Sequence, residues 1–265
     1  THSGQLVKQI TASVEENDPA SSLSYSFDGK RIFFTSGLSF HEIDVRTGQS
    51  TRLQEFGSRP KFAKFPNRHV ALALYQEEIL HRTKTHELPQ RLRIWNCDTN
   101  EILYDDFIPI EKQTPLWYPA VSPDETFVTF SWGHYQVRYD LVYHGDTITL
   151  GKRSTFERLV RVRGPLAFSP DSRYAAASEK APGRLGSFLD VETGEVINRF
   201  DADKLKDDGT STFGCRFAFS SDGRHIVSSD YLGRSAVWTF PEGKLVKVLE
   251  QFHANQPYRA TPKMI

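Results

Sequence analysis

Short apolar runs alternate with short polar runs along the whole chain, at the length of β-strands. The stretch Pro165–Phe200 shows this most clearly, because Ser-Pro-Asp-Ser, a Pro/Gly loop and Glu-Thr-Gly-Glu separate four apolar runs in it. Runs of about five residues bounded by such turn residues are typical of strands. Four strands and three turns in about 36 residues predict a small four-stranded antiparallel sheet, the size of one repeat of a repeat protein.

Four other stretches repeat this pattern at a nearly constant spacing. The first turn of each unit carries Asp or Asn and the last turn carries Gly or its equivalent, at positions 28 and 48, 67 and 100, 124 and 145, 171 and 194, and 222 and 243. The separations are therefore 20, 33, 21, 23 and 21 residues, and the long one contains a polar insertion, Tyr75–Gln90. The repetition predicts an all-β fold, a β-propeller of four-stranded antiparallel blades.

We predict five full blades within one domain that spans residues 1–265, at 23–56, 60–107, 118–152, 165–200 and 215–250. Gly4–Thr11 is interpreted as an orphan N-terminal outer strand of a further blade. Because this count is awkward for a closed ring, we expect a segment of a larger ring of seven or eight blades, with a five-bladed ring as the alternative. Thr1 is not an initiator, so a longer multidomain chain is also expected.

The repeated motifs resemble those of the WD40 family of β-propellers over most of the chain, from Leu23 to Glu250. The segments that carry the resemblance are the first turns Phe168-Ser-Pro-Asp171 and Phe219-Ser-Ser-Asp-Gly223, the third strands Ile94-Trp95-Asn96 and Val237-Trp238-Thr239, and the last turns Asp44-Val-Arg-Thr-Gly48 and Asp190-Val-Glu-Thr-Gly194. No Gly-His precedes a unit at the family's expected place, and only the fifth unit keeps much of the family's buried polar network. A degenerate WD40 propeller and another propeller family with similar turns both remain open.

Structural roles explain the most regular of these residues. Asp accepts backbone N–H bonds in tight turns, Gly adopts positive φ there, and a Trp on the third strand can wedge between adjacent blades. The residues given such roles are Asp28, Asp124, Asp171, Asp222, Asp230, Trp95, Trp238, Gly48 and Gly194.

Charge and cysteine content narrow the class of protein. Lys+Arg and Asp+Glu both number 33, so the net charge is zero, which argues against nucleic acid as the partner. Two cysteines, Cys97 and Cys215, are too few for a disulfide framework and favour a reducing compartment. No apolar run reaches the ~18 residues of a membrane helix. We therefore expect a cytoplasmic protein, with the nucleus as the alternative, and no membrane association.

Candidate chemistry is sparse. His81 and His86 lie near Glu77, Glu78 and Glu87 in the insertion, but their spacing is not that of one helix face, and a charged loop explains them better than a metal site. No Gly-x-Ser-x-Gly nucleophile elbow occurs. We predict no catalytic residues, no metal and no cofactor.

One basic cluster suggests a binding face. In a propeller, the connection between blades lies on the same face as the loops between second and third strands, so the Arg-rich connection 152–163 should share a face with the insertion 75–90. The candidate binding residues on that face are Arg158, Arg161, Arg163, Trp132, His134, Tyr135 and Arg184. Arg and aromatic side chains are enriched at interface hot spots, and Arg suits an acidic or phosphorylated partner. The sequence thus favours a non-catalytic platform for a protein or peptide partner; the alternative is a small-molecule-binding or accessory propeller of a larger enzyme.

Overall fold

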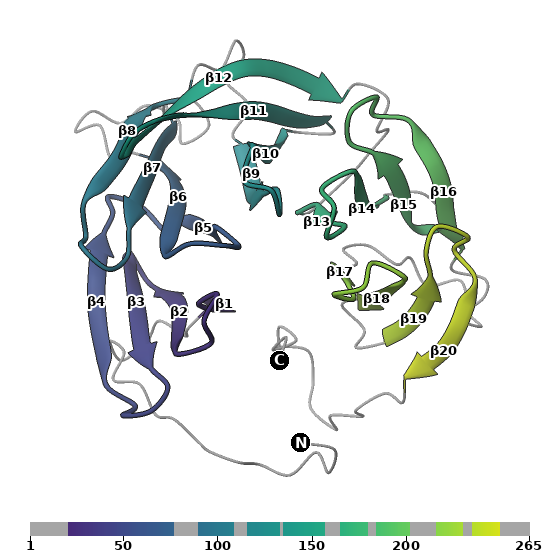
Figure 1. Ribbon diagram of the computed structural model, residues 1–265, viewed down its shortest axis with the longest axis horizontal. Helices are drawn as coiled ribbons and strands as arrows, with labels where there is room; N and C mark the ends of the chain where they lie inside the picture. The colour runs from purple at the N-terminus through teal and green to yellow at the C-terminus, as the bar shows by residue number, and fades with distance from the viewer. Residues whose placement is uncertain are drawn as a thin grey trace. The chain divides into compact units, whose positions relative to one another are not determined.

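Twenty strands make up the regular structure of the described chain (Figure 1). The computed structural model describes residues 21–76, 90–108, 116–132, 135–156, 165–179, 184–201, 216–229 and 235–249. These residues form five four-stranded sheets and no helix. In each sheet the strands lie side by side in chain order, and every neighbouring pair is antiparallel. The predicted all-β fold with four-stranded antiparallel propeller blades is confirmed.

The chain divides into two compact units. Unit 1 comprises residues 1–64 and 68–108, and unit 2 comprises residues 65–67 and 109–265. Unit 1 contains blade 1, with β1 Ser21–Tyr25, β2 Arg31–Ser36, β3 Ser39–Asp44 and β4 Ser50–Glu55, and blade 2, with β5 Lys61–Lys64, β6 Val70–Gln76, β7 Gln90–Asn96 and β8 Ile102–Phe107.

Unit 2 contains three blades. Blade 3 has β9 Leu116–Val121, β10 Phe127–Trp132, β11 Tyr135–His144 and β12 Thr147–Phe156. Blade 4 has β13 Ala167–Phe168, β14 Tyr174–Ser178, β15 Arg184–Asp190 and β16 Val196–Asp201. Blade 5 has β17 Arg216–Phe219, β18 His225–Ser229, β19 Ser235–Thr239 and β20 Leu245–Leu249.

Strand ends depart from the sequence expectation at a few places. β6 and β7 extend into the predicted insertion, to Gln76 and from Gln90, where the two residues pair with each other. In blade 3, β12 runs on to Phe156, beyond the predicted end at residue 152, because it pairs with β11 as far as Gln136. The orphan strand expected at 4–11 lies outside the described residues.

Positive φ angles occur at the turn positions that the sequence comparison aligned. The last turns have φ between 60° and 79° at Gly48, Asn100, Gly145, Gly194 and Gly243. In four first turns the residue after the Asp also has positive φ: Gly29, Glu125, Ser172 and Gly223. The first-turn Asp is held by its neighbours; Ser169 Oγ, for example, donates to Asp171 Oδ1 at 2.5 Å, and the Arg173 N–H donates to the same oxygen at 3.1 Å.

Neighbouring blades within each unit pack small residues against aromatic rings. In unit 1, Ala71, Ala73 and Trp95 of blade 2 belong to one buried cluster with Phe33 and Phe40 of blade 1. In unit 2, the corresponding face of blade 5 is buried against blade 4 in a cluster that contains Ala176, Phe188, Phe200, Ile226, Ala236 and Trp238. Alanines on the second strand leave room for these rings, so the core lies between the sheets.

The two buried tryptophans differ in one hydrogen bond. Trp238 Nε1 donates to Ser228 Oγ at 2.8 Å, and both residues are buried. Trp95 is fully buried, but its Nε1 has no hydrogen-bond partner among the described residues. The residue of blade 2 that occupies the place of Ser228, two residues beyond the one opposite the Trp, is Ala73.

Candidate functional site

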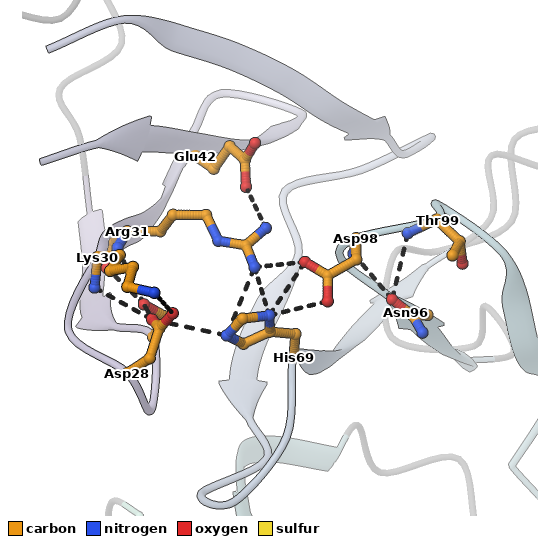
Figure 2. Close-up of polar contacts among 9 residues, drawn as sticks. Asp28, Lys30, Arg31, Glu42, His69, Asn96, Asp98 and Thr99 are labelled. Atoms are coloured by element: carbon orange, nitrogen blue, oxygen red, sulfur yellow. Dashed lines mark hydrogen bonds and ion pairs between the residues drawn. The ribbon is translucent and has the colours of Figure 1, made fainter. Parts of the chain in front are cut away.

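A charged cluster lies between the two blades of unit 1 (Figure 2). Arg31 stands at the start of β2, His69 directly precedes β6, and Asp98 lies in the turn between β7 and β8. The Arg31 guanidinium reaches Glu42 Oε2 at 3.3 Å through Nη1, and its Nη2 contacts Asp98 Oδ1 and His69 Nδ1. His69 Nδ1 lies 2.8 Å from Asp98 Oδ2, and His69 Nε2 lies 3.6 Å from Asp28 Oδ1.

The carboxylates of this cluster are held by local hydrogen bonds. Asp28 Oδ1 accepts the Ser26 hydroxyl at 2.6 Å and the Lys30 backbone N–H at 3.1 Å, and these bonds lower the pKa of Asp28 to about 2. Burial alone would raise the pKa of Asp98, but its hydrogen bonds with Arg31 and His69 outweigh burial, and the net effect lowers this pKa. Both carboxylates are therefore ionised at neutral pH.

The geometry suits a structural role better than catalysis. Each ring nitrogen of His69 faces a carboxylate, and the ring packs on Phe27 with 4.5 Å between ring centroids. A general base needs a ring nitrogen directed at a reacting proton, whereas here the nitrogens take part in the contacts that join the two blades. Among the described residues, no group of three or more His, Cys, Asp or Glu is arranged to hold a metal ion.

A second cluster, of exposed aromatic residues, lies in unit 2, and we call it the inner-strand cluster. It consists of Trp117 and Tyr118 on β9 and Arg216 on β17. The Trp117 and Tyr118 residues are 43% and 38% exposed, and the Arg216 guanidinium carbon lies 5.2 Å from the centroid of the Tyr118 ring. In unit 2 the inner strands of the three blades are β9, β13 and β17 (Figure 1). Blades 3 and 5 thus meet at this cluster across the inner end of blade 4.

Local backbone geometry places Tyr118 in this exposed position. Its φ is 50°, which is uncommon for a bulky residue. The pairing of β9 with β10 shifts register at this point, between the pairs Ala120–Thr129 and Trp117–Ser131. Such a bulge re-aims a side chain. The two aromatic side chains are thereby presented together at the start of β9.

Strand register connects the inner-strand cluster with part of the predicted binding face. Leu116 pairs with Trp132, Trp132 pairs with Tyr135, and Gln136 pairs with Phe156 at the end of β12. Trp117 therefore lies at the end of blade 3 that also carries the backbone of Trp132 and Tyr135. The chain leaves β12 from the same end toward the Arg-rich connection. We call this end of the sheets the loop end.

The structure describes only three of the seven predicted binding residues, and these only by their backbone. Trp132, Tyr135 and Arg184 are placed by their backbone at the ends of β10, β11 and β15. The others, together with most of the insertion and the structural candidate Asp230, lie outside the described residues: Arg158, Arg161, Arg163 and His134. The sequence did not predict the roles of Arg31, His69, Trp117, Tyr118 or Arg216.

Cys97 is a free, buried thiol in the core of unit 1. Burial raises its pKa to about 12, so the thiol is protonated at neutral pH and is no nucleophile. Cys215 lies outside the described residues. No helix of the described chain is long and apolar enough to cross a membrane.

Comparison with known proteins leaves the family open. No protein-family model matches the sequence, and no curated protein matches it. The class of the fold, a β-propeller of four-stranded blades, therefore rests on the strand order and pairing described above.

Proposed function

We propose that this protein is a non-catalytic protein-interaction platform of the WD40-like type that binds an acidic peptide segment of a partner at its loop end. The observation that carries the proposal is the inner-strand cluster, in which two aromatic residues are 43% and 38% exposed beside an arginine. Tyr, Trp and Arg are the residue types most enriched among interface hot spots. Unit 2 thus presents an anchor of this composition on rigid strands.

The chemistry of the ligand follows from the charges around the anchor. Arg216 lies over Tyr118, and the predicted Arg-rich connection leaves blade 3 from the same end. Arg forms charge-assisted, often bidentate hydrogen bonds with carboxylate or phosphate. An extended segment with an apolar or aromatic side chain next to Glu, Asp or a phosphorylated residue would fit both features.

The backbone of Tyr118 supports the same interpretation. Positive φ at a non-Gly residue costs of order 1–3 kcal/mol, and such strain clusters at ligand-binding sites. The WD40-like turns and third-strand tryptophans add support, because propellers of that type commonly serve as interaction scaffolds. The partner is expected to be a protein.

Peptide display tests the proposal without a known partner. A library of random 12-residue peptides is selected on the immobilised protein, and the enriched peptides are measured by fluorescence anisotropy. We expect acidic peptides that contain an aromatic residue. Trp117→Ala and Arg216→Glu should each weaken their binding at least tenfold, because truncation of a hot-spot residue typically costs about 2 kcal/mol or more.

A control variant with the same net charge distinguishes a specific effect of the proposed binding face from a general effect of net charge on affinity. Arg158, Arg161 and Arg163, all replaced by Glu, should abolish binding of the selected peptides. Lys30, Lys244 and Lys247, all exposed and also replaced by Glu, change the net charge equally and should leave affinity within about twofold. Enrichment of basic peptides, or equal affinity in both triple variants, would refute the proposed face. Peptides with phosphoserine in place of Glu show which form of acidic group binds more tightly.

A further inference from the structure

The two junctions between the blades of unit 2 have different cores. Where blades 4 and 5 meet, the buried cluster includes Ile226, Ala236 and Trp238 of blade 5. The centroid of the Trp238 ring lies 5.3 Å from that of Phe200 in blade 4. Where blades 3 and 4 meet, Phe127 is the one blade 3 residue in the buried cluster of the described chain. The apolar core of this second junction therefore contains a single ring from blade 3.

Beyond Phe127, blade 3 faces blade 4 with polar side chains. Side chains alternate between the two faces of a strand, so Thr129 and Ser131 share the face of Phe127 on β10. Gln136 lies opposite Ser131, and its Nε2 donates to Ser131 Oγ at 2.8 Å. Thr129 and Gln136 are both 0% exposed. This row runs from Phe127 toward the end of β10, so the polar half of the junction is the half nearest the loop end.

Blade 4 also places polar groups in this half of the junction. Ser187 pairs with Ala177, a member of the same cluster as Phe127, so both face blade 3. Ser187 is 0% exposed, and its Oγ has no hydrogen-bond partner in the described chain. Glu179, two residues beyond Ala177, is buried, and its Oε1 lies 3.6 Å from Arg199 Nε. A buried hydroxyl without a hydrogen bond is destabilising, so water that reaches Ser187 offsets part of the cost of opening this junction.

Further contacts between blades 3 and 4 lie near the opposite end of the sheets. The Asp124 N–H, in the first turn of blade 3, donates to Ser172 Oγ, in the first turn of blade 4, at 2.9 Å. The centroids of the Phe127 and Phe168 rings lie 5.4 Å apart. First turns lie at the end of the blades away from the loop end, so these contacts can act as a pivot.

We propose that blade 3 swings about this pivot and separates from blade 4 at the loop end, while blades 4 and 5 stay joined. The contact between Tyr118 of blade 3 and Arg216 of blade 5 holds the closed form from the inner side and acts as a latch. Opening moves Trp117 and Tyr118 away from Arg216 and so takes the inner-strand cluster apart. The proposal does not depend on peptide binding at the loop end.

Cysteine labelling compares the two junctions at neighbouring residues of one strand. Ala176 and Ala177 are both 0% exposed on β14, but Ala176 faces blade 5 and Ala177 faces blade 3. Ala176→Cys and Ala177→Cys are made in the 265-residue chain and alkylated with iodoacetamide. Peptide mass spectrometry follows each new thiol separately from Cys97 and Cys215. The labelling rate of a buried thiol reports how often its junction opens, so we expect Ala177→Cys to label at least tenfold faster than Ala176→Cys.

Two further variants test the face and the latch. Ser187→Cys replaces a hydroxyl by a thiol on the same face as Ala177, with little added volume, and should label within about threefold of the rate of Ala177→Cys. Arg216→Ala should raise the labelling rate of Ala177→Cys about threefold, the effect expected from loss of one cation–π contact. It should leave the rate of Ala176→Cys unchanged.

Three outcomes would contradict the proposal. Equal labelling of Ala176→Cys and Ala177→Cys would show that the two junctions open together. Fast labelling of Ala177→Cys with slow labelling of Ser187→Cys would show that the added sulfur atom itself forces the blades apart. An unchanged rate of Ala177→Cys in the presence of Arg216→Ala would show that the Tyr118–Arg216 contact is not a latch.

Discussion

At the scale of single residues, one hydroxyl distinguishes the two buried tryptophans. Trp238 Nε1 has Ser228 as its acceptor, whereas Trp95 Nε1 has none in the described part of the chain, and Ala73 stands at the equivalent place. Leaving a buried donor unpaired costs about 1–3 kcal/mol. We predict that Ser228→Ala lowers the free energy of unfolding by that amount, and that Ala73→Ser is neutral or stabilising because it supplies the missing acceptor.

The control for this pair lies in blade 4. Ala177 occupies the same position as Ala73 and Ser228, but Leu189 stands there in place of the Trp, so a new hydroxyl would meet no indole N–H. Ala177→Ser should therefore destabilise by about 1–3 kcal/mol. Urea unfolding followed by circular dichroism measures all three. An equal decrease in the free energy of unfolding for Ala73→Ser and Ala177→Ser would contradict the hydrogen-bond argument.

A second residue-scale prediction concerns acid stability. The pKa of Asp28 is about 2 in the folded chain, whereas an unfolded Asp titrates near ~3.9. A depressed carboxyl pKa stabilises the fold above the unfolded pKa, and that contribution is lost as pH falls through the folded pKa. The melting temperature should therefore fall between about pH 4 and pH 2, and Asp28→Asn should reduce the fall.

Asp146 provides the comparison for acid stability. It lies exposed in the turn between β11 and β12. Asp146→Asn should leave the pH dependence of the melting temperature as in the unmodified chain. If Asp28→Asn and Asp146→Asn gave the same profile from pH 7 to pH 2, the hydrogen bonds of Asp28 would not be the source of the effect.

At the scale of elements, glycine is required at two positions for different reasons: for space at one and for its backbone conformation at the other. A Cβ on Gly186 of β15 would lie 2.3 Å from the Ala177 carbonyl oxygen and 2.6 Å from the Phe217 ring, so this position needs space. Gly29 has φ +70° and open space around it, so the first turn needs its backbone conformation. We predict that Gly186→Ala costs about 2–3 kcal/mol and Gly29→Ala about 1 kcal/mol.

Substitution by Asn distinguishes the two needs. Asn tolerates positive φ better than most other non-glycine residues. Gly29→Asn should therefore keep stability within about 0.5 kcal/mol, whereas Gly186→Asn should be at least as harmful as Gly186→Ala. Thermal unfolding of the four variants decides the matter. A similar loss of stability for Gly29→Asn and Gly186→Asn would show that the space between β15 and β17 does not determine which residue fits at Gly186.

The strands themselves could be predicted from the sequence because their signals are local. Turn residues recur at fixed separations, so Asp28 with Gly48 and Asp171 with Gly194 define their blades without knowledge of long-range contacts. The end of β12 was harder, since its last pairs with β11 continue through residues without turn signals. Where no local signal marks the end of a strand, only the pairing with its neighbour defines it.

The clusters could not be predicted in the same way. Arg31 meets His69 and Asp98, which are 38 and 67 residues away in the sequence. Tyr118 of blade 3 contacts Arg216 of blade 5, and its exposed position depends on a bulge in β9. No turn residue in the sequence indicates this bulge. Composition pointed to Arg and aromatic residues as binding candidates, but it does not show which of them the register brings together. Distance along the chain is thus the limit of the sequence analysis.

At the scale of the whole molecule, charge balance controls solubility. The net charge is zero and the sequence isoelectric point is about 7.1, so self-repulsion is smallest near neutral pH. Precipitation by polyethylene glycol should need least precipitant near pH 7 and more at pH 5 or 9.

The Arg158/Arg161/Arg163 and Lys30/Lys244/Lys247 triple Glu variants each lose three positive charges and gain three negative ones, which takes the net charge from 0 to −6. Both should be equally more soluble than the unmodified chain at pH 7, while only the first loses binding of acidic peptides. A large difference in solubility between the two variants would mean that the three arginines promote self-association locally. The loss of peptide binding could then no longer be assigned to recognition of the peptide's negative charge.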